Sequence, residues 1–417
     1  MEGPVTELET GILIVGAGPT GLTLANLLGK GGTRTVLVER NSRTVDEPRA
    51  VSIDDESMRT MQAAGLDAAV EAIVARGYGS RYLGPHGDCF ALVDPVSKTF
   101  GFDKRNAFQQ PELEQVLLDG LARFDDVSCC LGYELVGFTQ SANKVHAEIR
   151  RDDGTMVQVT ADYMVACDGG RSDIRKSLGI ELVGSTFTER WLIVDMSATS
   201  NPFRHTEVSC NPRRPNISLP GPDGIRRYEF LLRAEEDENL ATSEEFVRDL
   251  LRDAGPDGDA PIRRKRVYTF HARVAERWRE NRVFLAGDAA HLSPPFAGQG
   301  MNSGLRDAHN LSWKLSAAVR GAVSEDFLDS YEVERKPHTL AMIQLALTLG
   351  RIMMPTSVLQ GALVRGAFRV LGIVPRVRDY FAQMRFKPPP RFEAGLIWPD
   401  AGDGGNSMVG RLLPQPV

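Results

Sequence analysis

The first forty residues carry three hydrophobic patterns in succession. Residues 11–15 (GILIV) and 35–39 (TVLVE) are nearly continuous apolar runs, a pattern typical of strands buried on both faces in a parallel sheet. Residues 20–30 between them have helical composition and length. The chain is therefore predicted to begin with a strand–helix–strand unit whose two strands are parallel.

Further along, the pattern changes from alternating helices and strands to strands alone. Helices are predicted over 54–75, 112–124, 243–253, 303–320 and 325–353, and strands over 129–138, 145–150, 156–161, 163–167 and 283–286. Residues 185–274 indicate a mostly antiparallel sheet around one helix. The segment from Lys387 onward is rich in proline and glycine and is predicted to be irregular.

This order predicts an α/β fold made of two units. A discontinuous Rossmann-type unit is expected over 1–77, 104–180 and 275–340, because the α/β pattern returns near residue 283. A mainly antiparallel β-sheet unit, 78–103 and 181–274, is expected to be inserted into it. C-terminal helices and an irregular tail are expected over 341–417.

Composition and charge narrow the possible partners. The net charge of -6 and the pI near 5.8 predict no general attraction to nucleic acid or anionic lipid. No apolar run of membrane-spanning length is present, and residues 1–4 have no basic region typical of a signal peptide. The 5 cysteines form no CxxC pair and no metal-ligand spacing, so we expect no metal site and a reducing, cytoplasmic location.

A glycine fingerprint lies between the first strand and the first helix. Gly16, Gly18 and Gly21 have the GxGxxG spacing, with Pro19 and Thr20 inside it. The first glycine allows a tight turn, the second a close approach of a pyrophosphate, and the third close helix–strand packing. The second strand ends in Glu39-Arg40, where an acidic side chain binds a ribose hydroxyl. The motif predicts dinucleotide binding without separating FAD from NAD, and glycines in a simple tight turn are the alternative.

Two aspartates follow other predicted strands. Asp168 begins a CDGGRSDIR motif at the end of one apolar run, and Gly287-Asp288 ends another. Open α/β sheets bind ligands at the carboxyl ends of their strands, where each carboxylate can accept hydrogen bonds from ligand hydroxyls. Each motif alone can be an ordinary Asp-Gly turn. Three such elements in this order favour a resident FAD.

With these motifs the chain resembles the class A flavoprotein monooxygenases, the single-component aromatic hydroxylases. Its residues 47–57, 224–230 and 286–314 resemble most the 3-(3-hydroxyphenyl)propionate hydroxylases, and Ile174 is a departure where valine is usual. The resemblance implies that the first unit binds FAD and the inserted unit the substrate. It implies FAD contacts from Arg49, Gln110, Asp168, Asp288, Pro295, Gly298, Gly300, Met301 and Asn302, with a second role of Asp168 toward NAD(P)H.

The resemblance also implies the reaction. NAD(P)H reduces the flavin, and O₂ then forms a flavin C4a-hydroperoxide that hydroxylates a phenolic acid ortho to its hydroxyl, here 3-(3-hydroxyphenyl)propionate. Because only one glycine fingerprint is present, the nicotinamide, with NADH favoured over NADPH, is expected to bind transiently. Two alternatives are left open. The chain can be a monooxygenase that acts on a polyketide or a chlorinated phenol, or a flavin-binding protein that catalyses no hydroxylation.

Candidates for the substrate-binding residues are fewer. Arg227 and Tyr228 lie on a predicted strand of the inserted unit, and His271 lies just before the chain returns to the first unit. With Pro295 they are the predicted catalytic residues, although Arg227 can equally be a surface cation and His271 a structural histidine. The family also implies a thioredoxin-like domain beyond residue 417, so a homodimer is left open.

Overall fold

The computed structural model describes residues 6–46, 49–398 and 407–415. Residues 1–4, on which the signal-peptide expectation rests, and residues 47–48 of the matching run lie outside the described residues, as do 399–406 and 416–417 of the tail. Within the described part, no single helix is long and apolar enough to cross a membrane, and one bent pair, Glu325–Met353 with Val358–Gly372, meets the criteria of length and composition together.

A largely parallel sheet forms the first layer of the described structure. Its strands follow the order β17-β18-β11-β1-β2-β8. They are β17 (Arg279–Glu280), β18 (Val283–Leu285), β11 (Met156–Ala166), β1 (Thr6–Val15), β2 (Thr35–Glu39) and β8 (Val127–Leu131), and β9 (Tyr133–Gln140) and β10 (Val145–Arg151) extend β11 as an antiparallel hairpin. The predicted strand–helix–strand unit is confirmed, because β1 and β2 pair in parallel around α1 (Pro19–Lys30).

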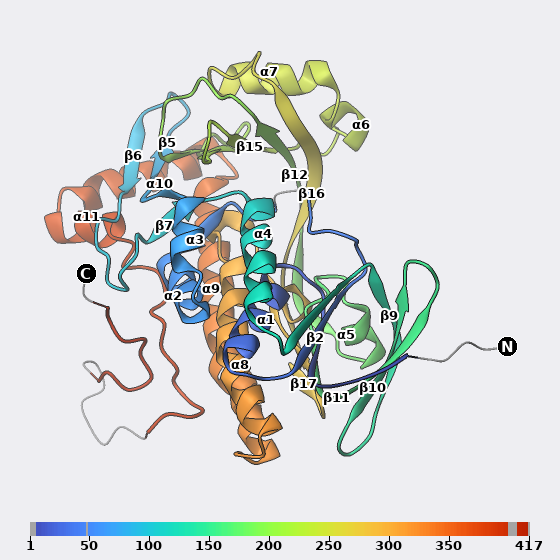
Figure 1. The fold of residues 1–417 in the computed structure, drawn as a ribbon. Helices are drawn as coiled ribbons and strands as arrows, with labels where there is room; N and C mark the ends of the chain where they lie inside the picture. Colours follow the sequence, from blue (N-terminus) through green and yellow to red (C-terminus); the bar gives the residue numbers. More distant parts are fainter. Residues whose placement is uncertain (1–5, 47–48, 399–406, 416–417) are drawn as a thin grey trace.

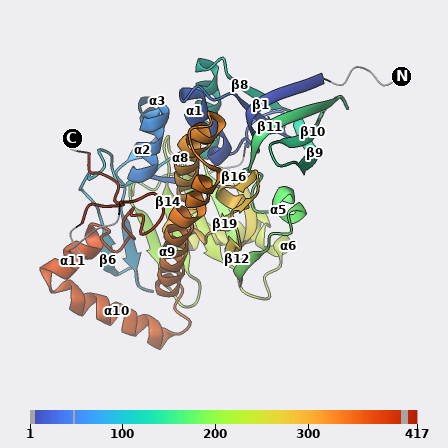
Figure 2. The same cartoon turned by 90° about the horizontal axis from the view of Figure 1, so that it is seen from below.

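Helices cover this sheet on the side where α1 lies (Figures 1 and 2). The buried core joins the apolar side chains of β1, β2 and β11 to those of the neighbouring helices. These helices are α2 (Asp55–Ala64), α3 (Asp67–Ala72), α4 (Gln110–Gly120), α8 (Gly300–Val319) and α9 (Ser330–Met353), and α5 (Asp173–Ser177) follows β11. Short strands β3 (Ser52–Asp54), β7 (Arg105–Ala107) and β4 (Ala75–Arg76) form a small third sheet.

The second large sheet is mostly antiparallel, as predicted for 185–274. Its order is β19-β16-β12-β15-β14-β13-β5-β6, with one parallel pair between β13 and β5. The strands are β19 (His291–Leu292), β16 (Ile262–Ala275), β12 (Leu182–Met196), β15 (Arg226–Leu231), β14 (Asn216–Pro220), β13 (Thr206–Ser209), β5 (Ser80–Leu83) and β6 (Cys89–Val93). Helices α6 (Glu238–Ala241) and α7 (Glu244–Ala254) lie over its outer face (Figure 1).

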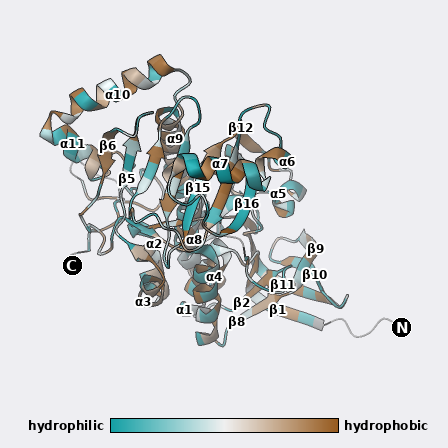
Figure 3. Ribbon diagram, turned by 90° about the horizontal axis from the view of Figure 1, so that it is seen from above, coloured by the Kyte–Doolittle hydropathy of each residue, from teal (hydrophilic) through white to brown (hydrophobic). Residues whose placement is uncertain are grey.

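The C-terminal helices α10 (Val358–Gly372) and α11 (Pro375–Ala382) extend beside β6 (Figure 2). Along α10, hydrophobic and hydrophilic residues alternate in Figure 3, and many of its apolar side chains are exposed. The chain after Lys387 is irregular where it is described, as expected.

Four predicted elements were wrong in their boundaries. Residues 129–138 are not one strand, because Gly132 takes a left-handed φ of 77° and turns the chain from β8 into β9. Residues 156–161 and 163–167 form one strand, β11, which pairs with β10 over its first half and with β18 at its end. Residues 54–75 contain two helices separated at Gly65, whose φ is 73°.

Close packing of α1 and α8 depends on glycine. A Cβ atom at Gly304 in α8 would lie 2.3 Å from Thr20 Oγ1 and 3.1 Å from Gly287 Cα. We expect Gly304→Ala to lower the free energy of unfolding by about 1–3 kcal/mol, because an extra methyl in a packed core forces neighbours apart. Urea denaturation measures the change.

Gly366→Ala in α10 is the matched control, because a Cβ there would meet nothing within 4 Å. Alanine is the better helix former, so this variant should be neutral or up to about 1 kcal/mol more stable. Equal effects of the two substitutions would contradict the packing argument.

Candidate functional site

Four chain segments meet at the carboxyl edge of the parallel sheet. Val15 pairs with Ala166 and with Val38, and Ala166 pairs with Leu285, so these strands end side by side. The residues that follow them are the glycine fingerprint, Glu39, Asp168 and Gly287-Asp288. A cavity of about 720 Å³ begins at this edge and extends to the inner face of the second sheet. The predicted cofactor motifs therefore share one cavity.

The glycine loop leaves its backbone open to this cavity. Gly16 has a φ of 108°, and a Cβ there would lie 2.3 Å from the carbonyl oxygen of Cys167. A Cβ at Gly21 would lie 2.0 Å from the carbonyl oxygen of Gly16. At Gly18 a Cβ would meet nothing within 4 Å, and Gly18 precedes α1 without a side-chain cap. The free N–H groups at this helix start can thus be approached by a phosphate.

Glu39 fixes the loop from the neighbouring strand. Its Oε2 accepts a hydrogen bond from the Ala17 N–H at 3.0 Å, and its Oε1 accepts one from the Asn41 N–H at 3.0 Å. Both Glu39 and the exposed Arg40 line the cavity. Since each carboxylate oxygen has two lone pairs, Glu39 retains capacity for a ligand hydroxyl.

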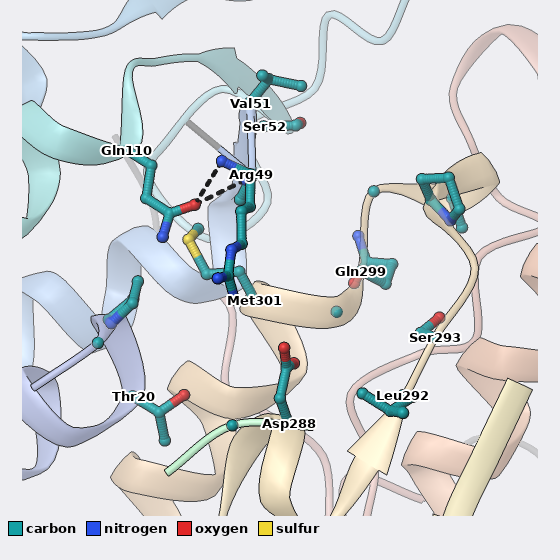
Figure 4. A pocket seen from close by; sticks show the side chains of 18 of the residues that line it. Thr20, Arg49, Val51, Ser52, Gln110, Asp288, Leu292, Ser293, Gln299 and Met301 are labelled. Atoms are coloured by element: carbon teal, nitrogen blue, oxygen red, sulfur yellow. Dashed lines mark hydrogen bonds between the residues drawn. The ribbon is translucent and has the colours of Figure 1, made fainter. Parts of the chain in front are cut away.

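Gln110 holds the segment that carries Arg49. Its Oε1 accepts hydrogen bonds from the N–H groups of Arg49 at 2.9 Å and Ala50 at 2.8 Å, and its Nε2 donates to Glu114 Oε1 at 2.8 Å. Figure 4 shows the two bonds that Gln110 Oε1 accepts and the Arg49 side chain extending into the cavity, with Asp288 pointing up from the opposite wall. Gln110 therefore holds the backbone of a residue whose cationic side chain lines the cavity.

Two carboxylates line the cavity with oxygen atoms available to a ligand. Asp168 Oδ2 accepts a hydrogen bond from the Ile174 N–H at 3.3 Å, while its buried Oδ1 has no partner among the described residues. Asp288 lies deep in the protein, yet its side chain is exposed because it faces the cavity. Burial raises the pKa of both carboxyl groups. Hydrogen bonds from ligand hydroxyls would relieve this cost.

The segment before α8 forms another wall. Pro295 to Ala297 form a 3₁₀ turn, Gly298 has a φ of 63°, and α8 begins at Gly300 without a side-chain cap. Gly298, Gly300 and Met301 line the cavity, so the first N–H groups of α8 lie beside it. Asn302 does not line it; its Nδ2 donates to Gly298 O at 2.7 Å and to Ser52 O at 3.0 Å, which holds the loop in shape.

The second sheet contributes two charged residues from β15. Arg227 donates from Nε to Asp195 Oδ1 at 2.7 Å and from Nη1 to the carbonyl oxygen of Arg49 at 2.8 Å. Glu229, two residues on, points to the same cavity and is buried. Burial, with a smaller contribution from Asp195, raises the pKa of Glu229 to about 7 although the nearby Arg227 opposes the rise. The Arg227 guanidinium, which is paired with Asp195, therefore opposes the rise in the Glu229 pKa without cancelling it.

Two predicted catalytic residues do not line this cavity. Tyr228 faces the other side of the sheet, where its hydroxyl donates to Asp257 Oδ2 at 2.9 Å and its ring stacks on Phe230 at 6.1 Å. His271 Nδ1 lies 2.9 Å from Thr186 Oγ1 on the neighbouring strand. Successive side chains of a strand point to opposite faces of the sheet. Tyr228 lies between Arg227 and Glu229, which face the cavity, so its own side chain points away from it.

Most of the other predicted residues share the cavity, and Gly21, Gly287 and Asn302 lie directly behind its wall. The predicted residues that line it are Gly16, Gly18, Pro19, Thr20, Glu39, Arg40, Arg49, Gln110, Asp168, Asp288, Pro295, Gly298, Gly300, Met301 and Arg227. The sequence reasoning missed Glu229. The period of two along β15 was a signal that could have found it, since Glu229 shares a face with Arg227.

These groups fit an elongated ligand that has an anionic centre and several hydroxyls. Phosphates can lie at the start of α1, ribose hydroxyls at Glu39, and a polyol chain near Asp168 and Asp288. An aromatic ring system can lie beside Pro295 and the start of α8. The unpartnered Oδ1 of Asp168 and the open space above Gly18 are the observations that FAD would satisfy.

Comparison with known proteins agrees with this geometry. The family described as FAD binding domain matches residues 9–346. A 3-(3-hydroxy-phenyl)propionate/3-hydroxycinnamic acid hydroxylase of Klebsiella pneumoniae is 42% identical over 414 residues, which are 99% of this chain and 74% of that protein. The enzyme of the same name from Comamonas testosteroni is 41% identical over 428 residues, 99% of this chain and 73% of that protein.

Solved structures extend the likeness to other hydroxylases. p-Nitrophenol 4-monooxygenase from Pseudomonas putida has a TM-score of 0.84 at 24% identity, over 92% of this chain and 98% of that one, which shows the shared fold. Anhydrotetracycline hydroxylase from Streptomyces rimosus has a TM-score of 0.76 at 28% identity, over 97% of this chain and 79% of that one. The chain therefore belongs to the FAD-dependent aromatic monooxygenases, in the group that includes the 3-(3-hydroxyphenyl)propionate hydroxylases.

Proposed function

We propose that this enzyme uses NAD(P)H and O₂ to hydroxylate 3-(3-hydroxyphenyl)propionate ortho to its hydroxyl, giving the 2,3-dihydroxy product. The observation that carries the proposal is the continuity of one cavity from the FAD motifs to the Arg227–Glu229 face of the second sheet. The names of the relatives at 42% and 41% identity support the substrate. NADH is the favoured reductant and is proposed to bind transiently, because the chain has one glycine fingerprint.

In this proposal the two large sheets divide the work. The residues around the parallel sheet hold FAD, and the inserted antiparallel sheet (78–103 and 181–274) holds the substrate. Gly18 and the start of α1 bind the pyrophosphate, Glu39 a ribose hydroxyl, and Asp288 a ribityl hydroxyl. The N–H groups at the start of α8 would stabilise negative charge on the flavin ring. Bound flavin supplies the redox and oxygen-transfer chemistry.

Glu229 is proposed to accept the proton of the substrate hydroxyl. Deprotonation makes the ring more electron-rich and so more reactive toward an electrophilic oxygen. A carboxylate with a pKa of about 7 is matched to proton transfer near neutral pH. Arg227, fixed by Asp195 and by the Arg49 carbonyl, keeps the neighbouring backbone and the position of Glu229 rigid.

The test of the substrate is a product assay. The holoenzyme is mixed with ¹⁸O₂, either NADH or NADPH, and 3-(3-hydroxyphenyl)propionate, and the product is analysed by mass spectrometry. We expect substrate-stimulated NADH oxidation and one ¹⁸O atom in a catechol product. Oxidation that yields only hydrogen peroxide, or hydroxylation of a polyketide or chlorinated phenol in its place, would contradict the proposal.

Removing the Asp288 carboxylate should weaken FAD binding. A hydrogen bond to a charged group contributes about 1.5–3 kcal/mol, so Asp288→Ala should raise the Kd for FAD roughly 10- to 100-fold. Quenching of flavin fluorescence on titration of the apoprotein measures this. Asp125→Ala, at an exposed residue of a surface turn, is the control and should bind FAD as the wild type does. An unchanged Kd for Asp288→Ala would remove Asp288 from the proposed FAD site.

Glu229→Gln tests the proposed base. Because Glu229 acts in its deprotonated form, kcat of the wild type should rise as the pH rises through about 7. The Gln variant should lose this rise, and its kcat should fall by about 100-fold, the lower end of typical general-base effects. Glu229→Asp should keep the pH dependence. A Gln variant whose pH profile matches that of the wild type would refute the role.

Stability provides a second measurement on the same variant. The pKa of Glu229 is raised from its ordinary 4.5 to about 7, so the folded protein retains a proton that the unfolded chain has lost. The free energy of unfolding should therefore fall as the pH rises from about 4.5 through 7. Glu229→Gln should lack this component, on the order of 3 kcal/mol given about 1.4 kcal/mol per pKa unit. Urea unfolding of the apoprotein at pH 5 and pH 8 measures it.

A further inference from the structure

The end of the cavity opposite the parallel sheet contains a second polar cluster. It lies where β5 and β13 pair, with Thr206 opposite Ser80 in register. Both side chains line the cavity, as does Arg105 of the adjoining strand β7. Between this cluster and Arg227 the cavity wall is apolar, with Ile217 and Leu219 of β14 and Val208 of β13. No motif drew attention to Arg105 in the sequence.

The charge of Arg105 is not compensated by a carboxylate among the described residues. Its Nη1 donates to Ser80 Oγ, its Nη2 donates to Tyr78 OH at 3.2 Å, and its guanidinium lies 4.3 Å from the centre of the Tyr78 ring. All these partners are neutral. Burial raises the pKa of the adjacent Tyr82 to about 12, so that hydroxyl does not supply an anion either. The guanidinium is thus fixed in place with N–H groups left for an acceptor.

Arg227, the arginine that faces the cavity from the second sheet, is different. Arg227 is paired with Asp195 through two hydrogen bonds and donates a third to the carbonyl oxygen of Arg49. A substrate carboxylate at Arg227 would have to compete with Asp195. Arg105 offers a half-buried cation with no such competitor, which is the preferred partner for a carboxylate.

The side-chain hydroxyl of Thr206 is a second, independent indication that a ligand group binds here. The residue is 3% exposed, and its Oγ1 is buried without a hydrogen-bond partner among the described residues. A buried hydroxyl without a partner is costly and uncommon in native proteins. It lies on the strand next to Ser80, whose Oγ already accepts from Arg105. A ligand carboxylate at this point could accept from Thr206 and Arg105 together.

The distance across the sheet between Arg227 and Ser80 agrees with an aromatic substrate that carries a hydroxyl at one end and a carboxylate at the other. Arg227 on β15 and Ser80 on β5 are three strand spacings apart, roughly 14 Å at about 4.8 Å each. A phenol ring with a three-carbon acid chain, with one hydrogen bond of about 3 Å at each end, fills such a span. Its hydroxyl would lie at Glu229, and its ring against Ile217 and Leu219.

We propose that Arg105, with Ser80 and Thr206, forms a carboxylate subsite that selects aromatic substrates with an acidic side chain. This inference rests on the proposed function for the identity of the acid. It assigns to the Arg105 end of the cavity the discrimination of phenolic acids from neutral phenols. Arg105 orients the substrate from the far end, so that the phenolic hydroxyl lies at Glu229.

The test compares 3-(3-hydroxyphenyl)propionate with 3-propylphenol, a neutral analogue of similar shape, on the FAD-loaded enzyme. We expect Arg105→Met to raise KM for the acid roughly 10- to 100-fold and to leave KM for 3-propylphenol within about 3-fold, because only the acid loses a charge-assisted hydrogen bond. Arg105→Lys should recover part of the loss. Thr206→Val should produce a smaller change of the same kind, again confined to the acid.

Arg151→Met, at an exposed hairpin residue, is the matched control and should change neither KM. Bound FAD and the thermal midpoint of each variant establish that it is folded. Equal losses for the acid and for the neutral phenol, or an unchanged KM for the acid in Arg105→Met, would overturn the subsite.

A binding measurement separates this inference from the proposed reaction. The change in flavin absorbance on titration gives a Kd for each compound without turnover. If the wild type binds the acid more tightly than the phenol and Arg105→Met abolishes that preference, the subsite stands even where no catechol forms. If the wild type hydroxylates the acid but the preference survives in Arg105→Met, the subsite is wrong and the proposed function stands.

Discussion

The geometry of the site depends on one buried carboxylate, that of Asp307 in α8. Its Oδ2 accepts from the Gly287 N–H at 3.2 Å and lies 2.6 Å from His291 Nε2, while its Oδ1 accepts from Arg335 Nε at 3.0 Å. A fully buried anion is costly unless its lone pairs are satisfied, so these contacts form together. They fix the end of β18, and hence Asp288, against both long helices.

A second buried ionic cluster extends this constraint to the C-terminal segment. Asp54, Asp55 and Glu56 have carboxylate oxygens within 4.8 Å of one another, an arrangement that can suit a metal ion. Arg306 instead pairs with Glu56 at 2.7 Å and Lys387 with Asp54 at 2.9 Å. The cations hold the pKa of Asp54 well below its usual range although burial opposes this, whereas burial raises the pKa of Asp55 to about 7. Because Lys387 also lines the cavity, the cluster holds an otherwise irregular segment against the site.

The sequence predicted the parts of the site that have a local signal. The glycine fingerprint, Glu39 and Gly287-Asp288 follow directly from apolar strands, and their convergence follows from parallel pairing. Arg105 and Thr206 carry no such signal, because each is connected to Ser80 only by the fold. Arg105 donates to the Ser80 hydroxyl, and Thr206 pairs with Ser80 across β5 and β13, 126 positions apart in the chain. Tyr228 was predicted as a catalytic residue and does not line the cavity. All residues of β15 up to Phe230 are buried, so hydrophobicity does not reveal which side of this strand faces the cavity.

The two sheets are linked where chemistry is proposed to occur. The hydrogen bond from Arg227 to the carbonyl oxygen of Arg49 joins β15 to the segment that Gln110 positions from α4. Asp195 on β12 orients the same guanidinium, so a shift of either strand would move Arg49 as well. A substrate held on the second sheet is therefore placed relative to the cofactor motifs by buried polar contacts, whose geometry is narrower than that of apolar packing. These contacts give the buried charged residues at the junction of the two sheets a structural role despite the cost of burying them.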